Sequence, residues 1–252
     1  MASSFVLVHS PLVGPQSWGA VGTALIRRGQ RVHVADLTGS LALGPPYLPR
    51  MAEAVSTLAT GAAILVGHSA AGPVLPALGQ ALGGAEGYVF VDARLPHPGR
   101  SWLDRAPLEQ AEQLRGMEHA GWLPPWSTWW GANELAELLP DPGDRDRFAA
   151  GCPRLPMALF EEVYPEVPGW PDAPCAYLLL SDAYREWAED ARSYGWPVIE
   201  LPSHHLGLLT NPDLIATSLL DLVAPGGAFA SSPWIGSAGN PPGGHVGSTA
   251  LS

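Results

Sequence analysis

Short apolar runs alternate with helix-like segments along the first third of the chain. The continuous runs AAILVG (62–67) and GYVFVD (87–92) are typical of strands that are covered on both faces of a sheet. Residues 16–29 carry apolar side chains at helical spacing and end in basic residues and a glycine, which predicts a helix and its end. This alternation favours βαβ units and a parallel sheet over a β-sandwich.

The same reasoning locates the remaining elements. The predicted strands span residues 5–10, 31–37, 62–67, 87–92, 175–181 and 197–201. The predicted helices span residues 16–29, 49–61, 183–195 and 211–223. The alternation breaks at residues 97–173, which are rich in Pro and Trp and show no strand pattern. We therefore predict an α/β fold with a doubly wound, mostly parallel sheet. Its core comprises residues 1–96 and 174–224, and a helical lid is inserted at 97–173.

Residues 225–252 are dominated by Gly, Pro and Ser, with Trp234 and Ile235 as their only strong apolar anchors. Such a segment buries too little apolar surface to order itself, so we predict a mostly disordered tail. In the rest of the chain, the apolar residues that make up 46% of the sequence are enough to build a sizeable core.

Charge and cysteine content exclude several classes of protein. A formal net charge of -11 argues against nucleic-acid binding, which needs a basic face. Cys152 and Cys175 form neither a disulfide framework nor a zinc site, and we find no phosphate-binding or dinucleotide motif. The apolar runs are too short for a signal peptide or a membrane span. We expect a cytoplasmic protein that acts on a small molecule without a metal or cofactor, in an oligomeric state that the sequence does not indicate.

The stretch LVGHSAAG (65–72) places Ser69 among small residues directly after a buried strand. A G-x-S-x-G stretch between a strand and a helix is typical of a nucleophile elbow, in which a tight turn exposes the serine hydroxyl. Ala71 stands where the second glycine is expected, and Gly72 follows one place later. The alternative is that Ser69 only caps a helix, since serine is a preferred N-cap residue.

Possible partners for Ser69 follow it in the order acid, then histidine. Asp182 comes directly after one predicted strand, and His204 and His205 lie in the loop after the next. A neutral imidazole can take the serine proton, and a buried carboxylate orients the ring. Taken singly, Asp182 could cap a helix and the two histidines could lie in a surface loop. The order of the three residue types, each after its own strand, favours a catalytic triad.

Asp92 is a second candidate for the acid, because it also ends a predicted strand. Some enzymes with a nucleophile elbow carry their acid at this place. We favour Asp182 and expect Asp92 to form a structural ion pair or a turn with Arg94.

With these residues the chain resembles small α/β-hydrolase-fold proteins. It is similar in particular to the compact branch that includes plant hydroxynitrile lyases, methyl-ester esterases and many bacterial hydrolases. The resemblance rests on FVLVHSPLVGPQSW, LVGHSAAG, YVFVDARLPHPG and SHHLGLLTNPD, and it covers residues 5 to about 223. It implies that His205, seven residues before Pro212, is the catalytic histidine in preference to His204.

The end of the first strand departs from that family. In the hydrolases resembled, this strand ends in His-Gly-x, and the amide of x joins the amide after the nucleophile in the oxyanion hole. Here the stretch is His9, Ser10, Pro11, and proline has no N–H. The Ala70 amide is the expected donor after the nucleophile. A second donor would come from the Leu12 amide or the Ser10 hydroxyl, or the reaction forms no oxyanion. We expect His9 and Ser10 to line the substrate site.

The resemblance also implies that the insertion at 97–173 covers the active site. It contains six of the ten tryptophans: Trp102, Trp122, Trp126, Trp129, Trp130 and Trp170. We expect most of these rings to pack the lid onto the sheet, and one or two of Trp126, Trp129 and Trp130 to face the substrate. Aromatic walls favour an apolar or aromatic substrate and exclude water.

Three functions follow from these residues. The first is a serine hydrolase of esters, thioesters or related acyl compounds that uses Ser69, His205 and Asp182. The second is a non-hydrolytic enzyme of the same fold, such as a cyclase, an eliminase or a lyase. A cyanohydrin lyase is not expected, because Leu206 stands where those enzymes carry a lysine. The third is a ligand-binding protein without turnover.

Overall fold

Six parallel strands form the central sheet, in the order β2-β1-β3-β4-β7-β8. The computed structural model describes residues 4–59, 63–224 and 229 of the chain. The strands are β1 (Ser4–Val8), β2 (Arg31–Val34), β3 (Ala63–His68), β4 (Ala85–Val91), β7 (Cys175–Leu179) and β8 (Val198–Glu200). This is the α/β-type parallel sheet predicted from the alternation of apolar runs.

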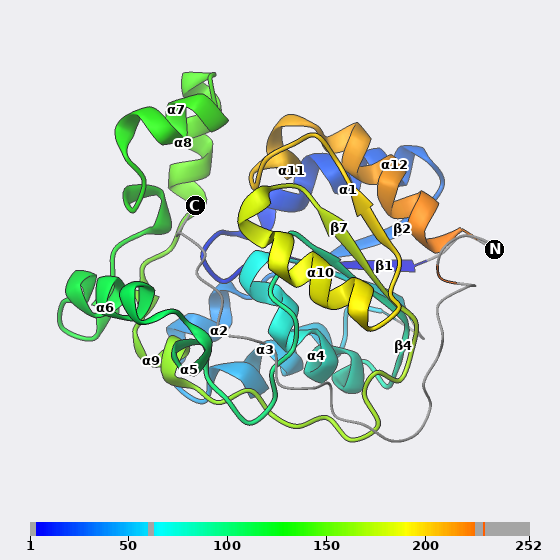
Figure 1. Cartoon of the computed structure of the whole chain (residues 1–252), viewed down its shortest axis with the longest axis horizontal. Coiled ribbons are helices and arrows are strands. Elements are labelled where there is room, and N and C mark those ends of the chain that lie inside the picture. Colours follow the sequence, from blue (N-terminus) through cyan, green and yellow to red (C-terminus); the bar gives the residue numbers. More distant parts are fainter. Residues whose placement is uncertain (1–3, 60–62, 225–228, 230–252) are drawn as a thin grey trace.

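Alternate residues of the strands are buried on opposite faces of this sheet. Phe5 and Leu7 pack with the apolar side chains of one group of helices, whereas Val6 and Val8 pack with those of a second group. The first group is α1 (Gly19–Arg27), α11 (Gly207–Thr210) and α12 (Pro212–Val223), and the second is α2 (Thr38–Ala42), α3 (Tyr47–Val55), α4 (Leu75–Ala81) and α10 (Arg185–Ser193). Figure 1 shows α1 and α12 on one side of the strands and α3 and α4 on the other.

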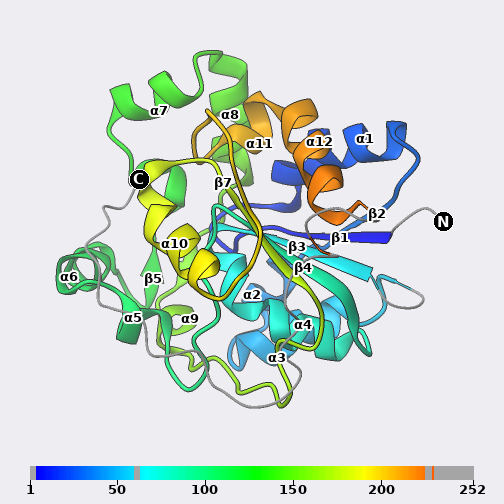
Figure 2. The same cartoon turned by 45° about the vertical axis from the view of Figure 1, so that its right-hand side comes forward.

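The insertion lies at the end of the sheet that is opposite the N-terminus, where Figure 1 shows its green helices. Its elements are α5 (Trp102–Arg105), α6 (Leu108–Met117), β5 (Trp122–Leu123), the 3₁₀ helix η3 (Trp126–Thr128), α7 (Ala132–Leu138), α8 (Pro142–Gly151), β6 (Leu155–Pro156) and α9 (Ala158–Glu161). In Figure 2, α7 and α8 form one group and α5, α6 and α9 form another. Strands β5 and β6 pair antiparallel and were not predicted, because two-residue strands leave no periodic pattern.

Several predicted boundaries shift in the structure. The helix predicted at 16–29 is a 3₁₀ helix, η1 (Pro15–Trp18), followed by α1. The helix predicted at 183–195 likewise begins with a 3₁₀ turn, η4 (Asp182–Tyr184), before α10. No helix among the described residues is both long and apolar enough to cross a bilayer. The tail predicted at 225–252 lies outside the described residues except for Phe229, whose ring packs against the α1 and α12 side of the core.

The topology places a switch point beside β1. Strand β1 pairs with β2 on one side and with β3 on the other, so the chain leaves these neighbouring strands in different directions. In open parallel sheets, ligands bind at the carboxyl ends of the strands at such a switch point. The loop from His9 to Val13 and the turn after β3 both lie there.

The turn after β3 has the geometry expected of a nucleophile elbow. Ser69 begins the 3₁₀ helix η2 (Ser69–Val74) with φ 59°, in the left-handed region that side-chain-bearing residues rarely adopt. A Cβ atom on Gly72 would lie 1.9 Å from the carbonyl oxygen of Arg94, whereas the methyl group of Ala71 is fully buried in the core. Glycine is therefore needed at 72, where the chain after β4 crosses the turn, and alanine is tolerated at 71.

Replacement of Gly72 by alanine should lower the free energy of unfolding by about 2 kcal/mol or more, because the added methyl group meets the backbone carbonyl of Arg94, in the segment that follows β4. The matched control is Gly19→Ala, at an exposed helical position with nothing within 4 Å of the added Cβ. That variant should gain about 0.5–1 kcal/mol. Urea denaturation measures both, and equal stabilities of the two variants would contradict this account of the turn.

Candidate active site

Ser69, His205 and Asp92 form a continuous chain of hydrogen bonds. His205 Nε2 lies 3.1 Å from Ser69 Oγ, and His205 Nδ1 lies 2.7 Å from Asp92 Oδ2. The exposed fractions of Ser69, His205 and Asp92 are 2%, 3% and 0%. Because an ionised Asp92 can only accept hydrogen bonds, His205 Nδ1 carries a proton and Nε2 is free to accept the serine proton. This arrangement can transfer a proton from the serine hydroxyl to the imidazole.

Asp92 is held as a carboxylate by donors from the neighbouring strand. It follows β4 with φ 43°, and its Oδ1 accepts the N–H groups of Leu180 and Ser181 at 2.9 and 3.0 Å. Its Oδ2 accepts the Ser181 hydroxyl at 2.6 Å as well as His205. Burial opposes the negative charge, but the hydrogen bonds from His205, Ser181 and Leu180 outweigh it and lower the pKa of Asp92.

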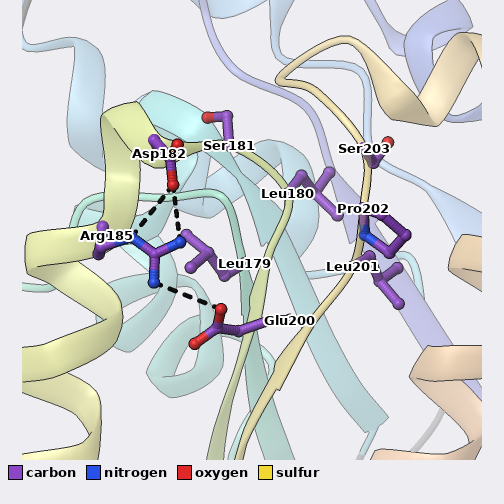
Figure 3. Close-up of a pocket in the computed structure, with 9 residues that line it drawn as sticks. All are labelled: Leu179, Leu180, Ser181, Asp182, Arg185, Glu200, Leu201, Pro202 and Ser203. Carbon is purple, nitrogen blue, oxygen red and sulfur yellow. Dashed lines mark hydrogen bonds and ion pairs between the residues drawn. The ribbon is translucent and has the colours of Figure 1, made fainter.

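Asp182, which we predicted as the acid, lies elsewhere. Its side chain is 88% exposed, and Oδ1 binds Arg185 Nη2 at 2.6 Å on the surface, as Figure 3 shows. Asp182 and Asp92 follow β7 and β4, which are neighbours in the sheet, but only Asp92 turns toward His205. The predicted pairing of Asp92 with Arg94 is also wrong: the Arg94 guanidinium lies 4.1 Å from the centre of the Trp102 ring and donates to Gln110.

The adjacent residues His204 and His205 differ in their hydrogen-bond partners. His204 Nε2 bonds to the Thr210 hydroxyl at 3.0 Å, so His205 is the residue that reaches Ser69. His68, directly before the nucleophile, places Nε2 3.0 Å from the carbonyl oxygen of His205. Since a carbonyl oxygen only accepts, His68 donates from Nε2 and holds the His205 loop against the elbow.

His9, which we predicted to line the substrate site, instead connects two loops. It is fully buried, its Nδ1–H donates to the Ser10 carbonyl at 2.8 Å, and its Nε2 accepts the Leu37 N–H at 3.0 Å. Burial lowers its pKa, in agreement with a neutral ring. His9 thus ties the loop after β1 to the loop after β2.

The loop after β1 offers few donors to a substrate. Pro11 has no N–H, and the Leu12 N–H points to Ser10 Oγ at 3.3 Å within the loop. The Ala70 amide, directly after the nucleophile, is the backbone donor that this type of turn supplies.

Tyr184 is a site residue that the sequence analysis missed. Its hydroxyl lies 3.2 Å from Ser69 Oγ, and its ring stacks on His205 with centroids 4.7 Å apart and planes 1° apart. Desolvation raises its pKa to about 12, so the phenol is neutral near pH 7. The available signal was its position two residues after Asp182, just beyond the carboxyl end of β7.

One tryptophan of the insertion reaches the site. Trp126 is 6% exposed, and its ring packs edge-on against His205 at 5.9 Å and against Trp130 at 5.1 Å. Trp129 donates its indole N–H to the Pro124 carbonyl within the insertion. The remaining tryptophans of the insertion make other contacts: Trp102 with Phe160, Trp122 with Arg154, and Trp170 with Tyr88 and Trp196.

An open cavity of about 350 Å³ lies near this site at the ends of β7 and β8. Figure 3 shows the ion pairs of Arg185 with Asp182 and Glu200 at its edge, and Ser181 joins its lining to the Asp92 carboxylate. In the part of the chain that the structure describes, no group of three or more His, Cys, Asp or Glu side chains could hold a metal ion.

Comparison with known proteins agrees with this fold. A sequence model of the alpha/beta hydrolase family matches residues 5–218. No curated protein matches the chain. Similar solved structures include an extracellular alpha/beta-hydrolase from a Paenibacillus species, described as sharing structural and functional homology with tobacco Salicylic Acid Binding Protein 2. It has 18% identity and a TM-score of 0.71, and the match covers 86% of this chain and 98% of that one.

Two further structures show the same fold. The pyrethroid hydrolase from Sphingobium faniae JZ-2 has 22% identity and a TM-score of 0.64, over 90% of this chain and 99% of that one. Methylketone Synthase I from tomato, complexed with beta-ketoheptanoate, has 19% identity and a TM-score of 0.64, over 88% of this chain and 98% of that one.

The buried His68 should make the protein less stable in acid. Burial, and next the nearby His205 ring, lower its pKa to about 3, from about 6.5 in an unfolded chain. Between these values the unfolded chain binds a proton that the folded protein does not, so stability falls as the pH falls. Each pH unit is worth about 1.4 kcal/mol. In His68→Gln, the loss of unfolding free energy from pH 7 to pH 4.5, measured with urea, should be smaller by about 2–3 kcal/mol. An identical loss in variant and wild type would contradict this role.

Proposed function

Because the chain belongs to the alpha/beta hydrolase family, we propose that it is a serine hydrolase that cleaves an ester, thioester or related acyl bond. The observation that carries the proposal is the pair of hydrogen bonds that His205 makes, with Ser69 at 3.1 Å and with Asp92 at 2.7 Å. It is the arrangement in which a serine hydroxyl is activated by a base whose ring is oriented by an acid.

In the proposed reaction, Ser69 Oγ attacks the acyl carbon while its proton passes to His205 Nε2. Asp92 stays ionised, keeps the proton on Nδ1 and stabilises the imidazolium that forms. His205 then gives its proton to the leaving group, and a water molecule, activated by the same ring, releases the acyl group from Ser69. The low exposure of all three side chains strengthens these electrostatic interactions.

The surroundings of Ser69 support a small, largely apolar or aromatic substrate. The Tyr184 and Trp126 rings pack on two sides of His205, and the apolar cluster around Trp126 includes Val13 and Leu206. Apolar walls with a few placed polar groups are typical of small-molecule sites. The pyrethroid hydrolases among the similar structures also support a hydrolytic reaction.

A second candidate is a non-hydrolytic reaction with His205 as acid or base. The observation that favours it is the absence of an N–H on Pro11, together with the engagement of the Leu12 amide by Ser10. Methylketone Synthase I is a structural neighbour whose name describes a synthase. A covalent acyl-enzyme distinguishes the two candidates, since only the hydrolase forms one on Ser69.

Covalent labelling tests the nucleophile directly. A fluorophosphonate probe should add one label per chain to the wild-type protein and none to Ser69→Ala, as measured by intact mass. Hydrolysis of p-nitrophenyl butyrate should show a burst if deacylation is the slower step. Absence of any label on a folded wild-type protein would contradict the serine-hydrolase proposal.

Paired aspartate variants test which carboxylate orients His205. Asp92→Asn should lower kcat for p-nitrophenyl butyrate by about 10⁴-fold, because it removes the acceptor that fixes the tautomer. Asp182→Asn should stay within about twofold of wild type, since it breaks only an exposed ion pair. Circular dichroism should first be used to check that both variants are folded. A large loss in Asp182→Asn with normal activity in Asp92→Asn would reverse the assignment.

A further inference from the structure

The proposed hydrolase lacks one of the two backbone donors expected at its oxyanion site. Pro11 has no N–H where the second amide is expected, and the Leu12 N–H points to Ser10 Oγ. Of these backbone amides, only that of Ala70 would then face the negative oxygen of a tetrahedral intermediate. Loss of one such donor costs about 10²–10³-fold in rate in enzymes where it has been removed. A side chain that supplies a donor would remove this deficit.

The hydrogen-bond chain at the site fixes the direction in which Tyr184 donates. Asp92 is ionised, so His205 Nδ1 carries the ring proton and Nε2 accepts. The Ser69 hydroxyl therefore gives its hydrogen to Nε2 and has only lone pairs left for Tyr184. Tyr184 must be the donor in its 3.2 Å contact with Ser69 Oγ.

Ring stacking and its place in the fold position Tyr184. Its ring is parallel to the His205 ring within 1° at 4.7 Å, and it belongs to η4, which continues from β7 into α10. The raised pKa, about 12, keeps the phenol protonated near pH 7. A fixed donor of this kind needs no reorganisation when charge develops beside it.

We propose that the Tyr184 hydroxyl is a catalytic residue that donates a hydrogen bond to the oxyanion, together with the Ala70 amide, in place of the donor that Pro11 cannot supply. This inference rests on the proposed serine-hydrolase function. The oxyanion forms on the same carbon that Ser69 Oγ attacks, so it arises next to the atom that Tyr184 already contacts.

The proton and electron balance of the step is simple. As Oγ bonds to the acyl carbon, its proton moves to His205 Nε2 and the carbonyl electron pair moves onto the oxygen. Tyr184 keeps its proton and shifts its hydrogen bond from Oγ, which loses basicity as it is acylated, to the oxyanion. When the carbonyl re-forms, the bond to the leaving group breaks, and the leaving group takes the proton from His205.

Tyr184→Phe removes the hydroxyl and keeps the ring that stacks on His205. With p-nitrophenyl butyrate, kcat should fall by about 10²–10³-fold while KM changes by less than about threefold. A trifluoromethyl ketone with the same acyl chain forms an oxyanion on Ser69, and its affinity should fall by a comparable factor. Tyr194→Phe, the same chemical change at the end of α10, is the matched control and should leave kcat and affinity unchanged.

The amide missing at position 11 allows a rescue experiment. Pro11→Ala restores an N–H there, and in the Tyr184→Phe background it should recover at least about tenfold in kcat. A tyrosine that only supports His205 by stacking would not be replaced by an amide on the loop after β1.

Two results would contradict the proposed role of Tyr184 and leave the serine-hydrolase proposal intact. One is a Tyr184→Phe variant with wild-type kcat. The other is a variant whose kcat falls while its affinity for the trifluoromethyl ketone is unchanged. In both cases the wild-type protein still hydrolyses the ester and reacts with the fluorophosphonate. A wild-type protein that does neither would contradict the proposed function as well as this inference.

Discussion

The buried hydrogen bond between His205 and Asp92 determines how the rest of the site is arranged. It joins a carboxylate with 0% exposure to an imidazole with 3%, at 2.7 Å. Such a carboxylate is stable only when donors surround it, and here the Leu180 and Ser181 N–H groups and the Ser181 hydroxyl provide them. These donors directly follow β7, and they reach Asp92 because β7 is the neighbour of β4 in the sheet. The parallel topology therefore builds the anion site, and the anion then fixes the tautomer of His205 and the direction of each hydrogen bond beyond it.

The fold and two of the three central residues could be predicted from the sequence. Apolar runs indicate strands that are buried on both faces, and the small residues around Ser69 indicate the crowding of a sharp turn. His205 could be chosen over His204 from its spacing to Pro212. These patterns are local in the sequence, so they can be interpreted without knowing which elements are neighbours in space.

The acid could not be predicted in the same way. Asp92 and Asp182 both follow strands that end at the same edge of the sheet, and no periodicity distinguishes them. The structure separates them by backbone conformation: Asp92 has φ 43° and turns toward His205, whereas Asp182 begins a 3₁₀ helix and pairs with Arg185 three residues later. Tyr184 was missed for a related reason. Its contact with Ser69 joins residues 115 positions apart, which only the packed fold brings together.

We propose that Ser69, His205 and Asp92 form one reactive centre, with the negative oxygen held beside Ala70 and Tyr184. A crystal structure of the fluorophosphonate adduct tests it most directly, because the phosphoryl oxygen takes the position of the oxyanion. We predict phosphorus on Ser69 Oγ, its oxygen within hydrogen-bonding distance of the Ala70 N–H and the Tyr184 hydroxyl, and His205 still bonded to Asp92. An adduct on another residue, or one on Ser69 in which His205 has left Asp92 for Asp182, would contradict it.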